Sequence, residues 1–334
     1  MILLLGASGY IGQAFASELL QRHIEFVPLS RLSLDYTQLD TLFSFVRRVR
    51  PKFVINAAGY VAGPEADDSD AARAETVQAN TLLPQTVARV CWLTRTPWAH
   101  VSSGSIYTGA RIAENGGFRL ERDLDTPETV DLFEKHPERF QGFTEDDEPN
   151  ATFRNPPCNF YGGTKAFAEE VLKRFDQHYL WRPGCILDRV AHPRNFLSAV
   201  QEQSNVPDGV GAFSHRMDFV RACLDLWEAG APYGIYNVVN PGGLTGRQVL
   251  QAIERLRRPE RKLRLSTNGS ARRFASASPR ARCLLDTSKL LAAGVFIRPA
   301  REALEDALDN WQELPQQEDL RERLLKKKTE TLKR

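Results

Sequence analysis

The sequence predicts an α/β fold built on a doubly wound parallel sheet, followed by a smaller C-terminal α/β domain. Two observations carry this prediction. The chain opens on an apolar run, residues 1–5, that breaks into a glycine-rich turn and continues into a helical pattern. Apolar runs then recur roughly every 20 to 30 residues with amphipathic helical patterns between them, which is typical of an open parallel sheet.

Periodicity places the individual elements. Those expected up to residue 107 are strand 1–5, helix 13–23, strand 24–30, helix 37–50, strand 52–59, a long helix or helix pair 71–93, and strand 96–107. Residues 108–157 interrupt the alternation because they are polar and turn-rich, with one or two short helices expected within 125–140. The elements expected after this segment are helix 161–175, strand 178–187, mixed loop and helix over 190–230, strand 233–240, and helices 245–256 and 299–314.

Composition excludes several classes of protein. The 334 residues carry 44 Lys and Arg against 42 Asp and Glu, a net charge of +2 that is too balanced for binding nucleic acid through a basic surface. The five cysteines form no CxxC pair, which favours a reduced, cytoplasmic protein over a disulfide scaffold. The apolar N-terminal run is too short for a signal segment or a membrane span, and the six histidines show no metal-ligand spacing. We therefore expect no nucleic-acid, membrane or metal binding.

A glycine-rich turn joins the first strand to the first helix. In Gly6-Ala-Ser-Gly9-Tyr-Ile-Gly12, the first glycine permits a tight turn, the second lets a pyrophosphate approach, and the third allows close helix–strand packing. The helix N-terminus then faces the anion. A P-loop is excluded because no Gly-Lys-Ser/Thr follows. The pattern predicts a Rossmann-type dinucleotide site whose loop residues are Gly6, Ser8, Gly9, Tyr10, Ile11 and Gly12.

The end of the second strand bears on the choice between NAD and NADP. An NAD site usually has an acidic residue here for the ribose hydroxyls, whereas this chain has Ser30 followed by Arg31. A guanidinium can bind a 2′-phosphate in bidentate geometry. NADPH is therefore favoured over NAD, and the alternative is that Arg31 is a solvated loop residue.

A third constellation joins a serine-rich strand end, residues 102–105, to the start of a later helix. Tyr161 and Lys165 are four residues apart, so they share one helix face. A phenol with a reference pKa of about 10 is a poor acid–base group at neutral pH, but a nearby ammonium favours the phenolate and lowers that pKa. A serine hydroxyl can hold a carbonyl oxygen and donate to it as charge develops. This set, following a dinucleotide turn, predicts proton transfer to a carbonyl.

With these motifs the sequence resembles the extended short-chain dehydrogenase/reductases, in their nucleotide-sugar-modifying branch. The glycine turn is similar to the family's GxxGxxG, and Asn56 to Gly59 (NAAG) to its fourth-strand signature. SSGSIY is similar to its serine strand and YGGTK to its YxxxK, and the resemblance spans most of the chain. It selects Ser103, not Ser102, so the implied catalytic residues are Ser103, Tyr161 and Lys165.

The resemblance also implies further cofactor contacts. Asp35 lies where the family contacts the adenine, and Pro183, in WRPG, corresponds to the turn beside the nicotinamide. The expected cofactor residues beyond the glycine turn are Ser30, Arg31, Asp35, Asn56, Ala57, Ala58, Gly59, Tyr161, Lys165 and Pro183.

Within that branch, the sequence is most similar to the dTDP-4-dehydrorhamnose reductases and the plant-type 3,5-epimerase/4-reductases of 4-keto-6-deoxy sugar nucleotides. Residues 55–80, 142–150 and 192–197 carry this likeness. The bifunctional members have a cysteine two residues after the catalytic serine or threonine, where this chain has Ser105. A hydroxyl is a poor group for removing a proton α to a ketone, which argues against 3,5-epimerisation. Cys158, close to the YxxxK motif, is interpreted as a small apolar residue.

Two features concern the sugar end of the expected site. Tyr161 lies 58 residues after Ser103, about double the spacing of the resembled family, so residues 110–142 form an insertion. A lid over the sugar, an oligomer contact and a decoration are the alternatives for it. The expected substrate contacts are Ser103, Gly104, Ser105, Tyr161, Arg194 and Asn195, with His192, His215, Arg216 and Asp218 as comparable candidates. The residues interpreted as packing residues are Trp92, Trp98 and His100.

Together these features imply an NADPH-dependent reductase of the 4-keto group of a nucleotide-activated 4-keto-6-deoxy sugar. A 4-epimerase of the same fold and a non-catalytic dinucleotide-sensing protein are the alternatives. We expect an NADP-binding domain over 1–182 that recruits the strand near 233–240, a substrate-binding region over 183–312, and a charged tail over 313–334. Besides the nucleotide-diphosphate sugar, the resemblance allows a homodimer, because the family commonly dimerises through two packed helices.

Overall fold

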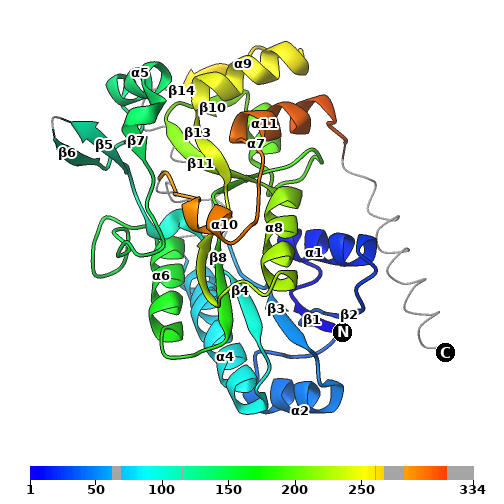
Figure 1. The fold of residues 1–334 in the computed structure, drawn as a ribbon. Helices are drawn as coiled ribbons and strands as arrows, with labels where there is room; N and C mark the ends of the chain where they lie inside the picture. Colours follow the sequence, from blue (N-terminus) through cyan, green and yellow to red (C-terminus); the bar gives the residue numbers. More distant parts are fainter. Residues whose placement is uncertain (62–68, 115, 260, 267–281, 314–334) are drawn as a thin grey trace.

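A six-stranded parallel sheet lies at the centre of the computed structural model, which describes residues 1–61, 69–114, 116–259, 261–266 and 282–313 (Figure 1). The strand order is β12-β8-β4-β3-β1-β2. The strands are β1 (Ile2–Leu5), β2 (Phe26–Leu29), β3 (Phe53–Asn56), β4 (Trp98–Val101), β8 (His178–Arg182) and β12 (Gly234–Asn237). The predicted doubly wound parallel sheet is confirmed.

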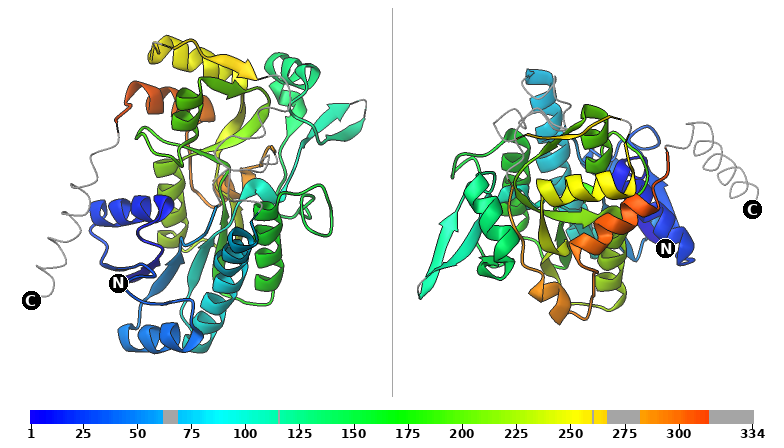
Figure 2. Two further views of the ribbon diagram at one scale, coloured as in Figure 1. Left: turned by 180° about the vertical axis from the view of Figure 1, so that it is seen from behind. Right: turned by 90° about the horizontal axis from the view of Figure 1, so that it is seen from above.

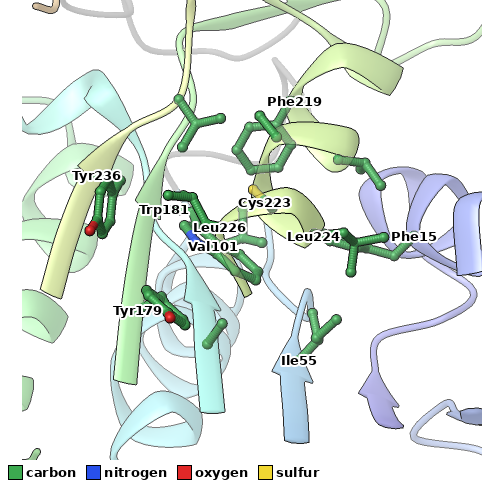
Figure 3. Close-up of a cluster of buried hydrophobic side chains, with 14 of the residues drawn as sticks. Phe15, Ile55, Val101, Tyr179, Trp181, Phe219, Cys223, Leu224, Leu226 and Tyr236 are labelled. Carbon is green, nitrogen blue, oxygen red and sulfur yellow. The ribbon is translucent and has the colours of Figure 1, made fainter. Parts of the chain in front are cut away.

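Helices cover both faces of this sheet (Figure 1). The covering helices are α1 (Tyr10–Gln21), α2 (Leu39–Val49), α4 (Leu83–Thr94), α6 (Phe160–Leu172), α8 (Arg216–Glu228) and α10 (Ser288–Ala292), and α3 (Asp70–Val77) packs on α6. On the α1–α8 face, the Phe15 ring lies 5.8 Å from Trp181 and 6.3 Å from Phe219 (Figure 3). On the other face, apolar side chains of α2, α4 and α6 form a second core against the strands. Because both faces are covered, β1, β3, β4 and β8 are buried along their whole lengths. β1 and β3 read as nearly continuous apolar runs, whereas β4 and β8 also bury polar residues such as His100 and Arg182.

The chain reverses its direction across the sheet between β1 and β3. β1 pairs with β2 on one side and with β3 on the other, so the loops at the carboxyl ends of β1 and β3 diverge. In open α/β sheets a crevice forms at such a switch point and binds ligands. The glycine turn after β1 therefore opens onto the edge where a cofactor is expected.

A smaller α/β region follows β8. Its strands are β9 (Cys185–Leu187), β10 (Asn205–Pro207), β11 (Val210–His215), β13 (Asn240–Thr245) and β14 (Arg264–Ser266), and its helices α7 (Phe196–Gln203), α9 (Gly246–Leu256) and α11 (Ala300–Asp309). Two expectations were wrong here. The run 178–187 splits into β8 and β9, which join different sheets, and β11 replaces part of the loop expected over 190–230. β11 is buried between β9 and β13, a position that lets a run with glycine, serine and histidine form a strand.

The insertion also contains strands that periodicity did not predict. β5 (Ala110–Glu114), β6 (Gly117–Glu121) and β7 (Phe140–Gln141) form an antiparallel sheet, and α5 (Pro127–Lys135) is one of the short helices expected. The β5–β6 hairpin projects from the body (Figure 2). Segment 282–286 anchors the insertion, because the Gly109 amide donates to the Arg282 carbonyl at 2.7 Å and the Phe143 amide to the Leu284 carbonyl at 2.9 Å. The proposed lid role stays a prediction.

Three further observations concern the chain as a whole. All five cysteines are unpaired thiols. Across the described ranges, no helix is both long and apolar enough to span a membrane. Nor does that part of the chain hold a group of three metal-ligating side chains. Residues 314–334 of the expected tail and part of the similar segment 55–80 lie outside the described residues.

Candidate active site

The glycine turn forms a cradle that side chains would fill. Gly6 has a φ of +74°, and a Cβ there would lie 2.6 Å from the Ala58 backbone. A Cβ on Gly12 would lie 2.0 Å from the Gly6 carbonyl oxygen. Gly9 is the N-cap of α1, which has no side-chain cap and no acidic residue in its first turn. The positive end of the helix dipole is therefore uncompensated, so the turn fits a dinucleotide pyrophosphate.

The end of β2 carries the side chains that were expected to select the cofactor. Arg31 is exposed and pairs with Glu75 of α3. The Ser30 amide donates to the Ser33 hydroxyl at 3.0 Å. Asp35 accepts from the hydroxyl and, at 3.1 Å, from the amide of Thr37, and these hydrogen bonds lower the pKa of Asp35. Each of these groups has a surface partner that a ligand could replace at small cost.

The backbone after β3 is fixed by the buried side chain of Asn56. The buried Asn56 side chain contacts His100 of β4, with Nδ2 and Nδ1 3.2 Å apart, and accepts the Ala58 amide at 3.1 Å. Burial, with a contribution from Lys165, keeps the pKa of His100 well below its usual value, so the imidazole is neutral. His100 is fully buried, as the packing interpretation expected. Asn56 thus shapes the backbone that faces Gly6.

The serine turn and the start of α6 meet at the ends of β4 and β8. Asn159 caps α6 by accepting the Gly162 amide at 2.6 Å, which places Tyr161 in the first helical turn. A Cβ on Gly162 would lie 2.6 Å from the Ser105 carbonyl oxygen, so the serine turn packs directly on that first turn. The Ser103 hydroxyl donates to the Ser105 hydroxyl at 2.9 Å. The expected catalytic side chains therefore come from adjoining turns.

Lys165 lies in the interior of the protein beside this turn. Its Nζ atom donates to the Val101 carbonyl at 2.9 Å and lies 5.9 Å from the centre of the Tyr161 ring. Burial lowers the pKa of Lys165 to about 8, and the nearby Glu169 carboxylate partly opposes this fall. The ammonium is therefore mainly protonated at pH 7 and can donate hydrogen bonds or act on the charge of a neighbouring phenol.

Gly104 is covered rather than open to a ligand. Its amide donates to the Pro183 carbonyl at 2.8 Å, and its carbonyl accepts the Cys283 thiol at 3.3 Å. A Cβ on Gly104 would meet Leu285 at 2.8 Å. Cys283 was not anticipated, because it follows in the sequence by almost two hundred residues. Burial raises the pKa of its thiol to about 12, so it stays protonated.

Of the two expected contacts after β9, one is structural. Asn195 is fully buried and is the N-cap of α7. Its amide group donates to the carbonyls of Asp188 and Val190, and its oxygen accepts the amides of Asp188 and Leu197. Those hydrogen bonds use its donors and acceptor, which corrects its assignment as a substrate contact. Arg194 is exposed and donates to the Val61 carbonyl at 2.9 Å, across from the loop after β3.

Tyr10 links the glycine turn to the smaller region. The His192 ring stacks on it at 4.3 Å and 13°, and the Arg216 guanidinium lies 4.1 Å from its ring centre on α8. Arg216 also donates to the Tyr10 carbonyl and to buried Asp188, each at 2.9 Å. Burial and the two arginines beside it, Arg194 included, lower the pKa of His192 to about 4. No local pattern predicts this cluster, because it joins three separate segments.

His215 and Asp218 belong to another part of the surface. Asp218 binds Arg298, with Oδ2 and Nε 2.7 Å apart, and His215 is buried at the N-cap of α8. Both line a cavity of 320 Å³ with Ser17 and Gln21 of α1. None of the expected catalytic side chains lines that cavity.

The sequence matches one protein family and is similar to several plant enzymes. A sequence model of the RmlD substrate binding domain family matches residues 1–313. A trifunctional UDP-glucose 4,6-dehydratase/UDP-4-keto-6-deoxy-D-glucose 3,5-epimerase/UDP-4-keto-L-rhamnose-reductase of Arabidopsis thaliana is 27% identical over 253 residues, 75% of this chain and 33% of that protein. A bifunctional dTDP-4-dehydrorhamnose 3,5-epimerase/dTDP-4-dehydrorhamnose reductase of the same plant is 24% identical over 64% of this chain and 62% of its own length. This chain therefore spans only part of these relatives.

Solved structures share the fold. A UDP-rhamnose synthase from Acanthamoeba polyphaga mimivirus has a TM-score of 0.75 at 18% identity, covering 92% of this chain and 98% of that one. A dTDP-4-dehydrorhamnose reductase from Bacillus anthracis in complex with NADP has a TM-score of 0.68 at 19% identity, covering 91% and 95%. These likenesses extend over both the large sheet and the smaller region.

Proposed function

The chain belongs to the RmlD substrate binding domain family, and we propose that it is an NADPH-dependent reductase of the 4-keto group of a nucleotide-activated 4-keto-6-deoxy sugar. One observation carries the proposal. Tyr161 and buried Lys165 share a face of α6, next to the Ser103 turn and at the same sheet edge as the glycine turn. Such a set supplies a proton and a hydrogen-bond donor beside a dinucleotide site, which is what carbonyl reduction needs.

The residues at this edge fit NADPH. Gly6, Gly9 and Gly12 leave room for the pyrophosphate, and Arg31 offers a guanidinium for the 2′-phosphate. When bound, NADPH supplies a hydride to the carbonyl carbon. We propose that Lys165 holds the nicotinamide ribose, which its buried ammonium near Tyr161 supports. NAD is disfavoured because the end of β2 offers a cation where a 2′-hydroxyl is best met by a carboxylate.

The chain's own residues would handle the proton and the developing negative charge. Ser103 donates to the ketone oxygen, exchanging its present partner, the Ser105 hydroxyl, for the substrate. Tyr161 then donates its phenolic proton to that oxygen as it becomes an alkoxide. The ammonium of Lys165 stabilises the phenolate left behind. Arg194 is the remaining exposed cation of the expected set, and we propose that it binds the nucleotide diphosphate.

Two thiols, Cys283 beside the serine turn and Cys158 just before the YxxxK motif in the sequence, argue against added 3,5-epimerase activity. Cys283 is buried under Gly104 and stays protonated, and burial also raises the pKa of Cys158. Neither is a thiolate at neutral pH, and Ser105 occupies the position of the epimerase cysteine. We therefore propose reduction without epimerisation.

The test is turnover of Tyr161→Phe. We expect kcat to fall at least about a thousandfold on a panel of dTDP-, UDP-, GDP- and CDP-linked 4-keto-6-deoxy sugars, with NADPH affinity unchanged. Tyr233→Phe, at an exposed tyrosine, is the matched control and should turn over normally. Product NMR identifies the reduced carbon. Two results with the parent protein would contradict the proposal. If the purified protein carries tightly bound oxidised cofactor and consumes no NADPH, the activity is 4-epimerisation rather than reduction. If the parent protein turns over no keto sugar in the panel, a dinucleotide sensor is favoured.

We further propose that the protein is a cytoplasmic homodimer. The adjoining helices α4 and α6 expose apolar side chains, with Trp92 66% and Phe167 48% exposed. Trp92 was interpreted as a packing residue within the chain, which is wrong for this structure, whereas Trp98 is buried as expected. Light scattering should give twice the chain mass, and Trp92→Ser/Phe167→Ser should halve it. The five unpaired thiols support a reducing compartment.

A further inference from the structure

A chain of buried polar side chains lies directly behind the proposed catalytic groups. Its centre is Glu169 of α6, whose side chain is 3% exposed. The Ser102 hydroxyl donates to Glu169, and Arg182 donates from Nε at 3.1 Å and from Nη2 at 2.6 Å. Replacing a buried ion pair by apolar residues of the same shape is often neutral or stabilising. Stability alone therefore does not account for this pair.

Each partner of Glu169 is the sequence neighbour of a residue already placed at the site. Ser102 precedes Ser103 at the end of β4, and Arg182 precedes Pro183 at the end of β8. Glu169 itself lies one helical turn beyond Lys165, on the face shared with the start of α6. One carboxylate thus ties two strand ends to the helix that carries the acid–base pair.

The same carboxylate is the charge that acts on Lys165. Groups facing the pair from β4 and β8 are His100, which is neutral, His178, whose pKa burial lowers, and the Arg182 cation. None of these three groups is an anion. The negative charge that opposes the fall in the pKa of Lys165 is therefore that of Glu169.

The chain of contacts continues to the insertion. Arg182 donates from Nη1 to the Tyr107 hydroxyl at 3.0 Å, and that hydroxyl donates to the Asp147 carbonyl at 2.6 Å. The Asp147 carboxylate pairs with Arg111 of β5. The first strand of the insertion is therefore connected to Glu169 through buried and partly buried polar contacts. Burial raises the pKa of Tyr107, so its phenol stays protonated near neutral pH.

We propose that Glu169 is a positioning residue for the reduction: through Ser102 and Arg182 it holds the ends of β4 and β8 against the acid–base face of α6. Its negative charge, one helical turn from Lys165, also favours the protonated ammonium. This inference rests on the proposed function, because the groups held are those assigned to that reaction.

Glu169→Gln is the decisive variant, because it keeps the shape and removes the charge. We expect kcat to fall about 10- to 100-fold, with KM for the keto sugar and Kd for NADPH changed less than about threefold. The alkaline limb of the kcat–pH profile should move to lower pH, since Lys165 loses the anion that holds its proton. The matched control is Glu170→Gln, which removes an exposed carboxylate paired with Arg154 at 2.8 Å. It should leave kcat and the alkaline limb unchanged.

Ser102→Ala tests the same link if Glu169→Gln fails to fold, because it leaves the buried ion pair intact. We expect a several-fold fall in kcat with an unchanged pH profile. Parental kcat in Ser102→Ala and a parental alkaline limb in any folded Glu169→Gln protein would overturn the proposal. The proposal would also be overturned if the loss of kcat in Glu169→Gln disappeared once kcat is calculated per folded protein. Tyr161→Phe in the same assay separates the two levels: if it keeps turnover, the reductase function fails, and if it is inactive while Glu169→Gln resembles the parent, only this inference fails.

Discussion

The two ends of the cofactor edge are built in opposite ways. At the end of β2, Arg31 and Asp35 are exposed, and Glu75, the partner of Arg31, also lies near the surface. At the ends of β4 and β8, Lys165 and Glu169 are each only 3% exposed. A pair of charges in contact interacts weakly in water and several times more strongly in the interior.

This difference in burial assigns cofactor selectivity to the β2 end and catalysis to the β4–β8 end. The Arg31–Glu75 pair is worth at most about 1 kcal/mol, so a 2′-phosphate can take the place of Glu75 at little cost. At the buried end, the same exchange would leave a charge unpaired in the interior, at a cost of about 3 to 5 kcal/mol. We therefore expect substitutions at the β2 end to change which cofactor binds, and substitutions at the β4–β8 end to change turnover.

The largest effect should come from Lys165→Met. We expect kcat to fall about a thousandfold, because the phenol of Tyr161 loses its ammonium. The stability effect has the opposite sign. Burial lowers the pKa of Lys165 from 10.5 to about 8, so the unfolded chain binds more protons between these pH values and the lysine destabilises the folded state below pH 8.

Thermal unfolding at several pH values measures this effect. Lys165→Met should raise the unfolding free energy by about 1 to 2 kcal/mol at pH 7, after the lost hydrogen bond to Val101 is included. The gain should shrink as pH rises from 8 towards 10.5. Lys173→Met, at an exposed lysine near the same helix, should change neither kcat nor stability. If Lys165→Met is less stable than the parent, the Lys165 ammonium does not destabilise the folded state, which would contradict its lowered pKa.

Gly12→Ala tests the turn between the two ends. The added Cβ would lie 2.0 Å from the Gly6 carbonyl oxygen, so backbone must move. We expect NADPH affinity to fall about 100-fold, or about 2.7 kcal/mol, in a calorimetric titration. Gly117→Ala, where a Cβ meets nothing within 4 Å, is the control. Unchanged affinity in Gly12→Ala would mean that the pyrophosphate binds elsewhere.

Arg31→Asp should have a smaller and more specific effect. We expect NADPH affinity to fall about tenfold and NADH affinity to rise, because the carboxylate repels a 2′-phosphate and accepts from the ribose hydroxyls. Glu75→Gln frees the same guanidinium and should leave NADPH binding within about threefold. If cofactor selectivity in Arg31→Asp stays as in the parent, Arg31 is a solvated loop residue.

The smallest effect should come from Asp35→Asn. The carboxylate is exposed and its hydrogen bonds go to Thr37 in the same turn, so we expect NADPH affinity to change less than about threefold. A tenfold loss in the same titration would show that the β2 end is as tightly coupled as the β4–β8 end.

The parts of the fold that could be predicted from the sequence are those with a local signal. The parallel strands read as apolar runs because both faces of the sheet are covered, and Tyr161 and Lys165 share a face because they lie four apart. β5 and β11 have no such signal. Ala110 of β5 is buried with side chains of α5 and Leu284, and β11 is buried between β9 and β13, so neighbours distant in sequence decide their conformation.

In the candidate site too, residues with a local sequence signal could be predicted, whereas roles set by distant neighbours could not. Asn195 was expected to contact substrate because its sequence context resembles a binding segment, yet its amide is used up as the cap of α7. Glu169 was not singled out, and Arg182 was named only as part of WRPG, because an acidic residue in a helix and a basic residue in a strand are ordinary until the fold buries them together.

The sequence by itself determined the doubly wound sheet, the glycine turn and the spacing of the acid–base pair. Each of these depends on residues close together in the chain, whose periodicity and backbone freedom are local properties. Only the tertiary structure decided which charges are buried: the lowered pKa of Lys165, the covered Gly104 and the partner of Arg31 all depend on segments far apart in sequence. Burial sets the strength of an electrostatic interaction, and no local pattern specifies it.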